Sequence, residues 1–246
     1  MTPDSRDAVR PSSKAAPVVA GVDGCRGGWV VVTRTPGRLG AEARFVESFA
    51  EILSTRQAPA IIAVDMPIGL LSERETGGRA CDREARRRLP GRASSVFSPP
   101  IRRVLSALTF EETHGSGLTI QAFHLLPKIR ELDAIVTPGR QRRIRECHPE
   151  LVFTRLAGTP PRHSKKTEAG QRERLALLRR DGRLPLDART FRKLRADLPA
   201  SHVRPDDLLD AAALAVAAED MHAGTAFRVP DRPDRDARGL RMEIWY

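Results

Sequence analysis

Two apolar runs joined by a glycine-rich turn constrain the fold of this chain more than any other feature. Residues 18–22 read Val-Val-Ala-Gly-Val, and residues 29–32 read Trp-Val-Val-Val. A parallel crossover needs about a dozen residues or more, so runs this close together can pair only as an antiparallel hairpin. The sequence therefore predicts a hairpin over residues 17–34, with a carboxylate, Asp23, where its first apolar run ends.

Three further segments have the pattern of strands. Residues 41–48 alternate between apolar and charged side chains, which is typical of a strand with one buried face. Residues 60–65, Ala-Ile-Ile-Ala-Val-Asp, form the continuous apolar run of a strand that is buried on both faces. Residues 143–147 are predicted to form a short strand that contains Glu146. With the helical segments between them, these strands predict an α/β fold in which helices cover a mixed sheet.

Apolar periodicity and capping residues predict the helices, which cover residues 49–55, 81–89, 120–136, 149–156, 168–180, 187–197 and 206–222. The least regular region, about 66–142, is interpreted as a helical insertion that forms a cap over the functional site of the domain. Residues 17–228, including this insertion, are predicted to form a single domain. Residues 1–16 show no hydrophobic periodicity, which predicts a disordered tail. Residues 229–246 are predicted to form a C-terminal tail, in which 242–246 could add a final edge strand.

The charge of the chain favours a polyanionic partner, nucleic acid first. Its 246 residues carry a formal net charge of +11, and a basic domain of this kind is the electrostatic footprint of nucleic-acid binding. A bias in composition is the alternative explanation, because arginine greatly outnumbers lysine along the whole length.

Composition also sets expectations about location and redox chemistry. No apolar stretch reaches the length that spans a bilayer, and Met1 to Lys14 lack the apolar core of a secretory signal. We therefore expect a cytoplasmic protein without membrane association. The three cysteines have no CxxC spacing, which argues against a disulfide framework or a zinc site. No feature predicts an oligomeric state.

Five acidic residues are candidates for a catalytic site: Asp23, Asp65, Glu146, Asp207 and Asp210. The first three lie at the ends of predicted strands, where sites assemble in α/β sheets. Asp207 and Asp210 share one helix face, because they are three residues apart. If these side chains converge, they form an all-oxygen pocket suited to Mg²⁺ or Mn²⁺, with Asp23, Asp65 and Asp210 as ligands.

Each acidic residue also has a structural alternative. Asp207 could stabilise the N-terminus of its helix, where carboxylates favour the helix dipole. Glu146 could pair with Arg145 or another arginine. Asp23 could brace the glycine turn, and Asp65 could cap the loop that precedes Pro67. Capping explains Asp210 poorly, because it follows the first turn of an otherwise apolar helix.

Five basic residues are candidates for contacts with substrate phosphates: Arg26, Arg86, Lys128, Lys165 and Lys166. Lysine and arginine side chains are the usual partners of phosphate oxygens. The alternative is that these residues form solvated helix faces and ends, as most charged runs do.

Several motifs together resemble a known family. They read Gly-Val-Asp-Gly-Cys-Arg-Gly-Gly-Trp (21–29), Asp-Met-Pro-Ile-Gly (65–69), Cys-Asp-Arg-Glu-Ala-Arg (81–86), Glu-Cys-His-Pro-Glu (146–150) and Asp-Asp-Leu-Leu-Asp-Ala (206–211). This set is similar to the "domain of unknown function 429", whose members are described as predicted nucleases of ribonuclease H-like fold. The resemblance covers nearly all of residues 17–228. It implies a five-stranded sheet in the order 3-2-1-4-5 with flanking helices.

The last motif also resembles the metal-binding helix of Holliday-junction resolvases, in which two acidic residues three apart precede an alanine-rich run. By that likeness, Asp23, Asp65, Asp207 and Asp210 are implied as metal ligands. Glu146 carries over less directly, because the fifth strand of that fold does not always supply a ligand.

Taken together, these observations predict a Mg²⁺- or Mn²⁺-dependent nuclease in which Asp23 bridges the metals and Glu146 or Asp207 orients the attacking water. One alternative is an ATP-handling protein related to actin-like kinases, although the chain has no second Asp-x-Gly turn. Another is a nucleic-acid-binding protein of the same fold without catalytic activity.

Overall fold

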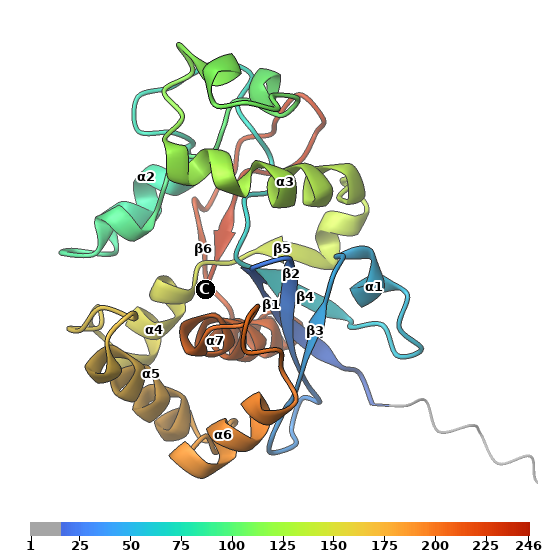
Figure 1. Ribbon diagram of the computed structural model, residues 1–246, viewed down its shortest axis with the longest axis vertical. Helices are drawn as coiled ribbons and strands as arrows, with labels where there is room; N and C mark the ends of the chain where they lie inside the picture. Colours follow the sequence, from blue (N-terminus) through green and yellow to red (C-terminus); the bar gives the residue numbers. More distant parts are fainter. Residues whose placement is uncertain (1–15) are drawn as a thin grey trace, which may run out of the picture.

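The computed structural model describes residues 16–246, and its centre is a five-stranded mixed sheet (Figure 1). Nearly all of the predicted N-terminal tail, 1–16, lies outside the described residues. The strands are β1 (Val19–Cys25), β2 (Gly28–Arg34), β3 (Glu42–Val46), β4 (Ile61–Val64) and β5 (Ile144–Glu146). Their order is β3-β2-β1-β4-β5, in which β1–β2 and β2–β3 are antiparallel and β1–β4 and β4–β5 are parallel. This is the predicted ribonuclease H-like order, and it includes the predicted hairpin.

Helices cover both faces of the sheet. They are α1 (Ala50–Leu53), α2 (Ala80–Arg87), α3 (Ile120–Ile135), α4 (Pro149–Ala157), α5 (Glu168–Asp181), α6 (Ala188–Ala196) and α7 (Pro205–Ala223). One face packs against α7, with α4 and α5 beyond it, and the other face packs against α1 and α3 (Figure 1). The strands alternate between these two cores, because successive side chains of a strand point to opposite faces.

The helix α7 lies directly on strand β1 at Gly21. A Cβ atom at Gly21 would come 2.1 Å from the carbonyl oxygen of Ala211 and from the backbone nitrogen of Ala215, so only glycine permits this approach. Asp23 lies two residues further along the same strand and therefore faces α7 as well. Close helix–strand packing thus brings Asp23 of the first strand to Asp210 of the last long helix.

The long connection between β4 and β5 contains α2 and α3, as the predicted helical insertion requires. Figure 1 shows both helices on the far side of the molecule from α5 and α6. The chain after α7 forms β6 (Arg228–Val229) and β7 (Ile244–Trp245), which pair with each other in a separate antiparallel sheet. The strand expected over 242–246 is therefore not a regular edge strand of the main sheet, to which a single bridge between Cys147 and Trp245 connects it.

The C-terminal segment is packed rather than loose. Val229, Leu240 and Ile244 are buried, and Leu240 joins the same core as α3. The described C-terminal residues thus form part of the packed structure. Across residues 16–246, no helix has both the length and the apolar character needed to cross a bilayer.

Candidate functional site: buried carboxylates at the carboxyl ends of β1 and β4

Three of the predicted carboxylates approach one another where β1, β4 and α7 meet. Asp23 is the fifth residue of β1, and Asp65 directly follows β4, with its N–H donating to the carbonyl of Val22 at 3.0 Å. Asp210 lies in the second turn of α7 and is fully buried. Since β1 and β4 are parallel, their carboxyl ends lie at the same edge of the sheet. The sheet and the glycine contact with α7 therefore assemble this group.

Burial raises the pKa values of all three carboxyl groups, and repulsion within the group adds to the shifts of Asp23 and Asp210. Burial raises the pKa of Asp23 well above its ordinary value, and the charges of Asp65 and Asp210 raise it further. Burial likewise raises the pKa of Asp65, with opposing contributions from His148 and Lys165. The pKa of Asp210 rises to about 7, again chiefly through burial, although Lys165 opposes the rise. Without a further cation, carboxylates at these three positions destabilise one another.

The shift at Asp210 predicts how stability depends on pH. Between its ordinary pKa of 3.8 and its folded value of about 7, the folded state binds more protons, so stability decreases as pH rises. When the pH is raised from about 5 to about 7.5 in the presence of a chelator, the free energy of unfolding of the wild type should fall by on the order of 2 kcal/mol more than that of Asp210→Asn. This difference corresponds to about 4–8 °C in Tm. Thermal unfolding of both proteins at the two pH values measures this, and parallel curves would contradict it.

Lys165 supplies positive charge to this group. Its Nζ donates to Oδ2 of Asp210. Burial lowers the pKa of Lys165, but Asp210, Asp23 and Asp65 raise it more, so the ammonium group stays charged. The other oxygen, Oδ1 of Asp210, is buried and has no hydrogen-bond partner. A buried carboxylate oxygen without a partner is costly, and a cation at this oxygen would remove the cost.

Glu150 is a member of the site that the sequence did not identify. Its Oε1 accepts from Nη2 of Arg174 at 2.5 Å, and its Oε2 is buried without a partner. Its charge raises the pKa values of Asp65 and Asp210. Glu150 is the second residue of α4, after Pro149, and an acidic residue in a first turn is normally explained by the helix dipole. That local explanation conceals its proximity to the site.

Asp207 lies near Asp23 but serves mainly to start α7. Its Oδ2 accepts from the backbone N–H of Arg204 at 2.8 Å and forms part of a capping box. It still contributes to the raised pKa of Asp23. Asp207 therefore makes the contact expected if it stabilises the N-terminus of α7. Its charge also acts on Asp23 of the carboxylate group.

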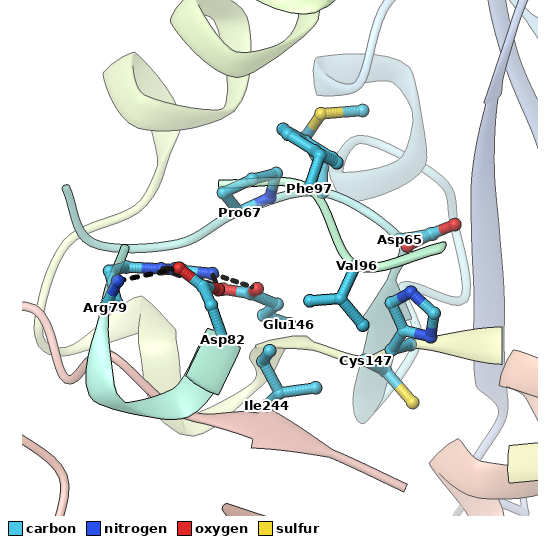
Figure 2. A pocket seen from close by; sticks show the side chains of 11 residues that line it. Asp65, Pro67, Arg79, Asp82, Val96, Phe97, Glu146, Cys147 and Ile244 are labelled. Carbon is cyan, nitrogen blue, oxygen red and sulfur yellow. Dashed lines mark hydrogen bonds and ion pairs between the residues drawn. The ribbon is translucent and has the colours of Figure 1, made fainter. Parts of the chain in front are cut away.

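Glu146 is not brought to the other carboxylates. Its Oε1 accepts from Nη2 of Arg79 at 2.6 Å, and its Oε2 accepts from the N–H of Ile68 at 2.7 Å. Figure 2 shows Arg79, Asp82 and Glu146 together at one end of a small cavity, with Asp65 at the other end beyond Val96. The structure therefore shows the arginine pairing that was the alternative for Glu146: the buried guanidinium of Arg79 binds both Glu146 and Asp82.

The predicted phosphate contacts fall into two groups. Lys165 and Lys166 line a cleft of about 450 Å³ together with Asp23, Asp65 and Glu150. Lys128 instead donates to the carbonyl of Gly28 and lies over the ring of Trp29, with 4.5 Å between its Nζ and the ring centroid.

The two predicted arginine contacts also lie apart from this cleft lining. Arg86 donates to the carbonyls of Gly77 and Val96 within the insertion. Arg26 is exposed on the turn after β1. Arg92, which the sequence did not single out, is the arginine that lines the cleft.

The donor set at this edge fits a hard divalent cation. Every carboxylate in it offers oxygen, the ligand that Mg²⁺ and Mn²⁺ prefer, and Oδ1 of Asp210 has no other partner. Within residues 16–246, however, no three aspartate, glutamate, histidine or cysteine side chains converge closely enough to enclose a metal ion. Metal binding by these carboxylates would therefore require a rearrangement of their side chains.

The sheet has the strand order of a ribonuclease H-like fold, and three carboxylates lie near one edge of it. The chain belongs to the family described as "Protein of unknown function (DUF429)", whose model matches residues 21–235. Among solved structures, RuvC from Thermus thermophilus is similar at 17% identity and a TM-score of 0.35, over 85% of this chain and 97% of its own. No curated protein matches the sequence.

Proposed function

We propose that this protein is a divalent-metal-dependent hydrolase of phosphodiester bonds in nucleic acid. The observation that carries the proposal is the group formed by the buried Asp23 and Asp210 and the half-buried Asp65: the charge of Asp65 raises the pKa values of the other two, and Oδ1 of Asp210 has no partner. An arrangement that destabilises the metal-free fold is typical of a functional site rather than a structural one.

In this proposal, Asp23, Asp65 and Asp210 hold Mg²⁺ or Mn²⁺. When bound, the metal would polarise the phosphoryl oxygens and lower the pKa of a bound water. Glu146 and Asp207 are already engaged by Arg79 and by the N–H of Arg204, so Glu150 is better suited to orient the attacking water. Its Oε2 is the free oxygen, because Arg174 fixes the other one.

Positive side chains around the cleft supply the contacts to the phosphate backbone. Arg92 and Lys166 line the cleft beside the carboxylates, and the chain as a whole carries a net charge of +11. Each phosphate contact releases condensed counterions, so affinity for nucleic acid should fall steeply with salt. This charge supports a polyanionic substrate over a neutral one.

The decisive experiment combines metal occupancy with cleavage. Crystals soaked in Mn²⁺ should give anomalous density at Asp23, Asp65 and Asp210. Mn²⁺ should also permit cleavage of a panel of single-stranded, duplex and branched DNA and RNA. Absence of Mn²⁺ at high concentration, with the carboxylates still apart, would overturn the proposal. Salt-sensitive nucleic-acid binding that ignores Asp23→Asn would indicate a non-catalytic binder instead, and tight ATP binding would indicate an ATP-handling protein.

A further inference from the structure

Lys165 holds an unusual position for a lysine that lines a binding cleft. Its Nζ donates to the fully buried Asp210, and its charge lowers the pKa values of Asp23 and Asp65. The neighbouring Lys166 lines the same cleft, but its side chain is exposed and no charge–charge contact ties it to the three carboxylates. One of two adjacent lysines is thus directed into the acidic group.

The backbone around Lys165 is fixed before any ligand arrives. The carbonyl of Ser164 accepts from the N–H of Thr167 at 3.0 Å and from its hydroxyl at 2.8 Å. Thr167 caps α5 by accepting from the N–H of Gly170 at 3.1 Å. A Cβ at Gly170 would come 1.9 Å from the carbonyl oxygen of Ser164, so the loop packs directly against the helix. This turn presents Lys165 from a rigid base, which favours a built-in role over a chance contact.

Asp210 divides its two oxygens between different environments. Oδ2 accepts from Lys165, whereas Oδ1 is buried and unpartnered. The three carboxylates assigned to the metal, Asp23, Asp65 and Asp210, carry –3 when all are ionised, and Lys165 reduces this to –2, which one divalent cation would balance; Glu150 is paired with Arg174. A second divalent cation would leave excess positive charge next to the ammonium group of Lys165. Like charges close together in a partly buried site repel each other strongly.

We propose that Lys165 takes the place of a second metal ion, so that the site holds one divalent cation and one fixed ammonium group joined through Asp210. This inference rests on the proposed function, because it assumes that the carboxylates bind a metal. It departs from the two-metal arrangement that a carboxylate cluster suggests by itself. Lys165 would then supply, without dissociating, the positive charge that a second ion supplies to a phosphate in two-metal sites.

The test is the stoichiometry of Mn²⁺ binding, measured by calorimetry and by electron paramagnetic resonance, which reports coupling between paired ions. The wild type and Lys165→Arg should bind one ion per chain, with no coupled-pair signal. Lys165→Met should bind a second ion and give that signal, or bind its first ion about tenfold more tightly, because a competing charge is gone. The control, Lys193→Met at an exposed lysine of α6, should bind Mn²⁺ as the wild type does.

Each other outcome has a distinct meaning. Two coupled ions in the wild type would overturn the inference and leave the proposed function intact, and this holds even if Lys165→Met does not fold. One ion of unchanged affinity in a folded Lys165→Met would also overturn it. No Mn²⁺ binding to any of these proteins would instead overturn the proposed function itself.

Discussion

Asp23→Asn should make the metal-free protein more stable and remove its response to divalent metal. Asp23 is 7% exposed, and burial and the charges of Asp65 and Asp210 raise the pKa of its carboxyl group, so its charge opposes folding near neutral pH. Asparagine keeps the shape and removes the charge. We expect a gain of about 1 kcal/mol, equivalent to about 2–4 °C in Tm for a chain of this length.

The same substitution removes a proposed metal ligand. Mn²⁺ affinity should fall by about 100-fold or more, since even changes to groups that only orient ligands cost about 10–100-fold. Thermal unfolding with and without Mn²⁺ measures both effects without knowledge of the substrate. Asp231→Asn is the control, because Asp231 is an exposed carboxylate of the C-terminal segment. A destabilised Asp23→Asn that keeps its Mn²⁺ response would contradict the assignment of Asp23.

Arg79→Met should destabilise the protein by about 3–5 kcal/mol, the usual cost of removing one partner from a buried charge network. The guanidinium of Arg79 is almost fully buried. It donates to Glu146 at 2.6 Å and to Asp82 at 2.7 Å, and it reaches the carbonyls of Ile68 and Gly69 at 3.1 Å each. Methionine would leave two buried carboxylates without a cation. The Tm should fall by about 10 °C or more.

Two variants distinguish the effect of breaking this buried network from the effect of removing a positive charge near α2. Arg83→Met, on the same helix, should change stability by less than about 1 kcal/mol, because Arg83 and its partner Glu75 are substantially exposed. Arg79→Met combined with Glu146→Gln should recover part of the loss, since it removes one of the stranded charges. If Arg79→Met and Arg83→Met unfold at the same temperature, the buried network does not have the role that we assign to it.

The network also connects stability to the proposed site. Glu146 accepts from the N–H of Ile68, and Arg79 donates to the Ile68 carbonyl, so both residues fix the loop that begins at Asp65. Arg79 thus acts on Asp65 as a positioning residue without touching it. A partly recovered double variant should therefore still bind Mn²⁺ more weakly than the wild type.

Local patterns in the sequence predicted the strands, and the family resemblance implied their order. The runs at 18–22 and 29–32 could pair in only one way, and the apolar run at 60–65 predicted a strand buried on both faces. The order β3-β2-β1-β4-β5 is the one that the resemblance implied. Asp23 and Asp65 could be placed at the same edge for the same reason. Asp210 stood out because a carboxylate interrupts an apolar helix face.

Most of the interactions that the sequence did not predict are contacts between distant segments. Arg79 lies just before a stretch of basic residues that had the pattern of a solvated helix, and only the fold places it next to Glu146. Glu150 has an adequate local explanation at the start of α4, which conceals its contact with Arg174 of α5. Lys128 was a candidate for phosphate contacts, and the structure shows it over the ring of Trp29 and donating to the carbonyl of Gly28.

The contact between Gly21 and α7 also has a consequence for how the protein is made. The proposed site needs Asp23 from the first strand and Asp210 from the last long helix, which are separated by most of the chain. Contacts of such large sequence separation form late in folding, because their loop-closure entropy must be overcome first. During synthesis, the face of β1 that carries Gly21 stays uncovered until α7 has left the ribosome. A nascent chain that lacks α7 therefore has no assembled acidic group.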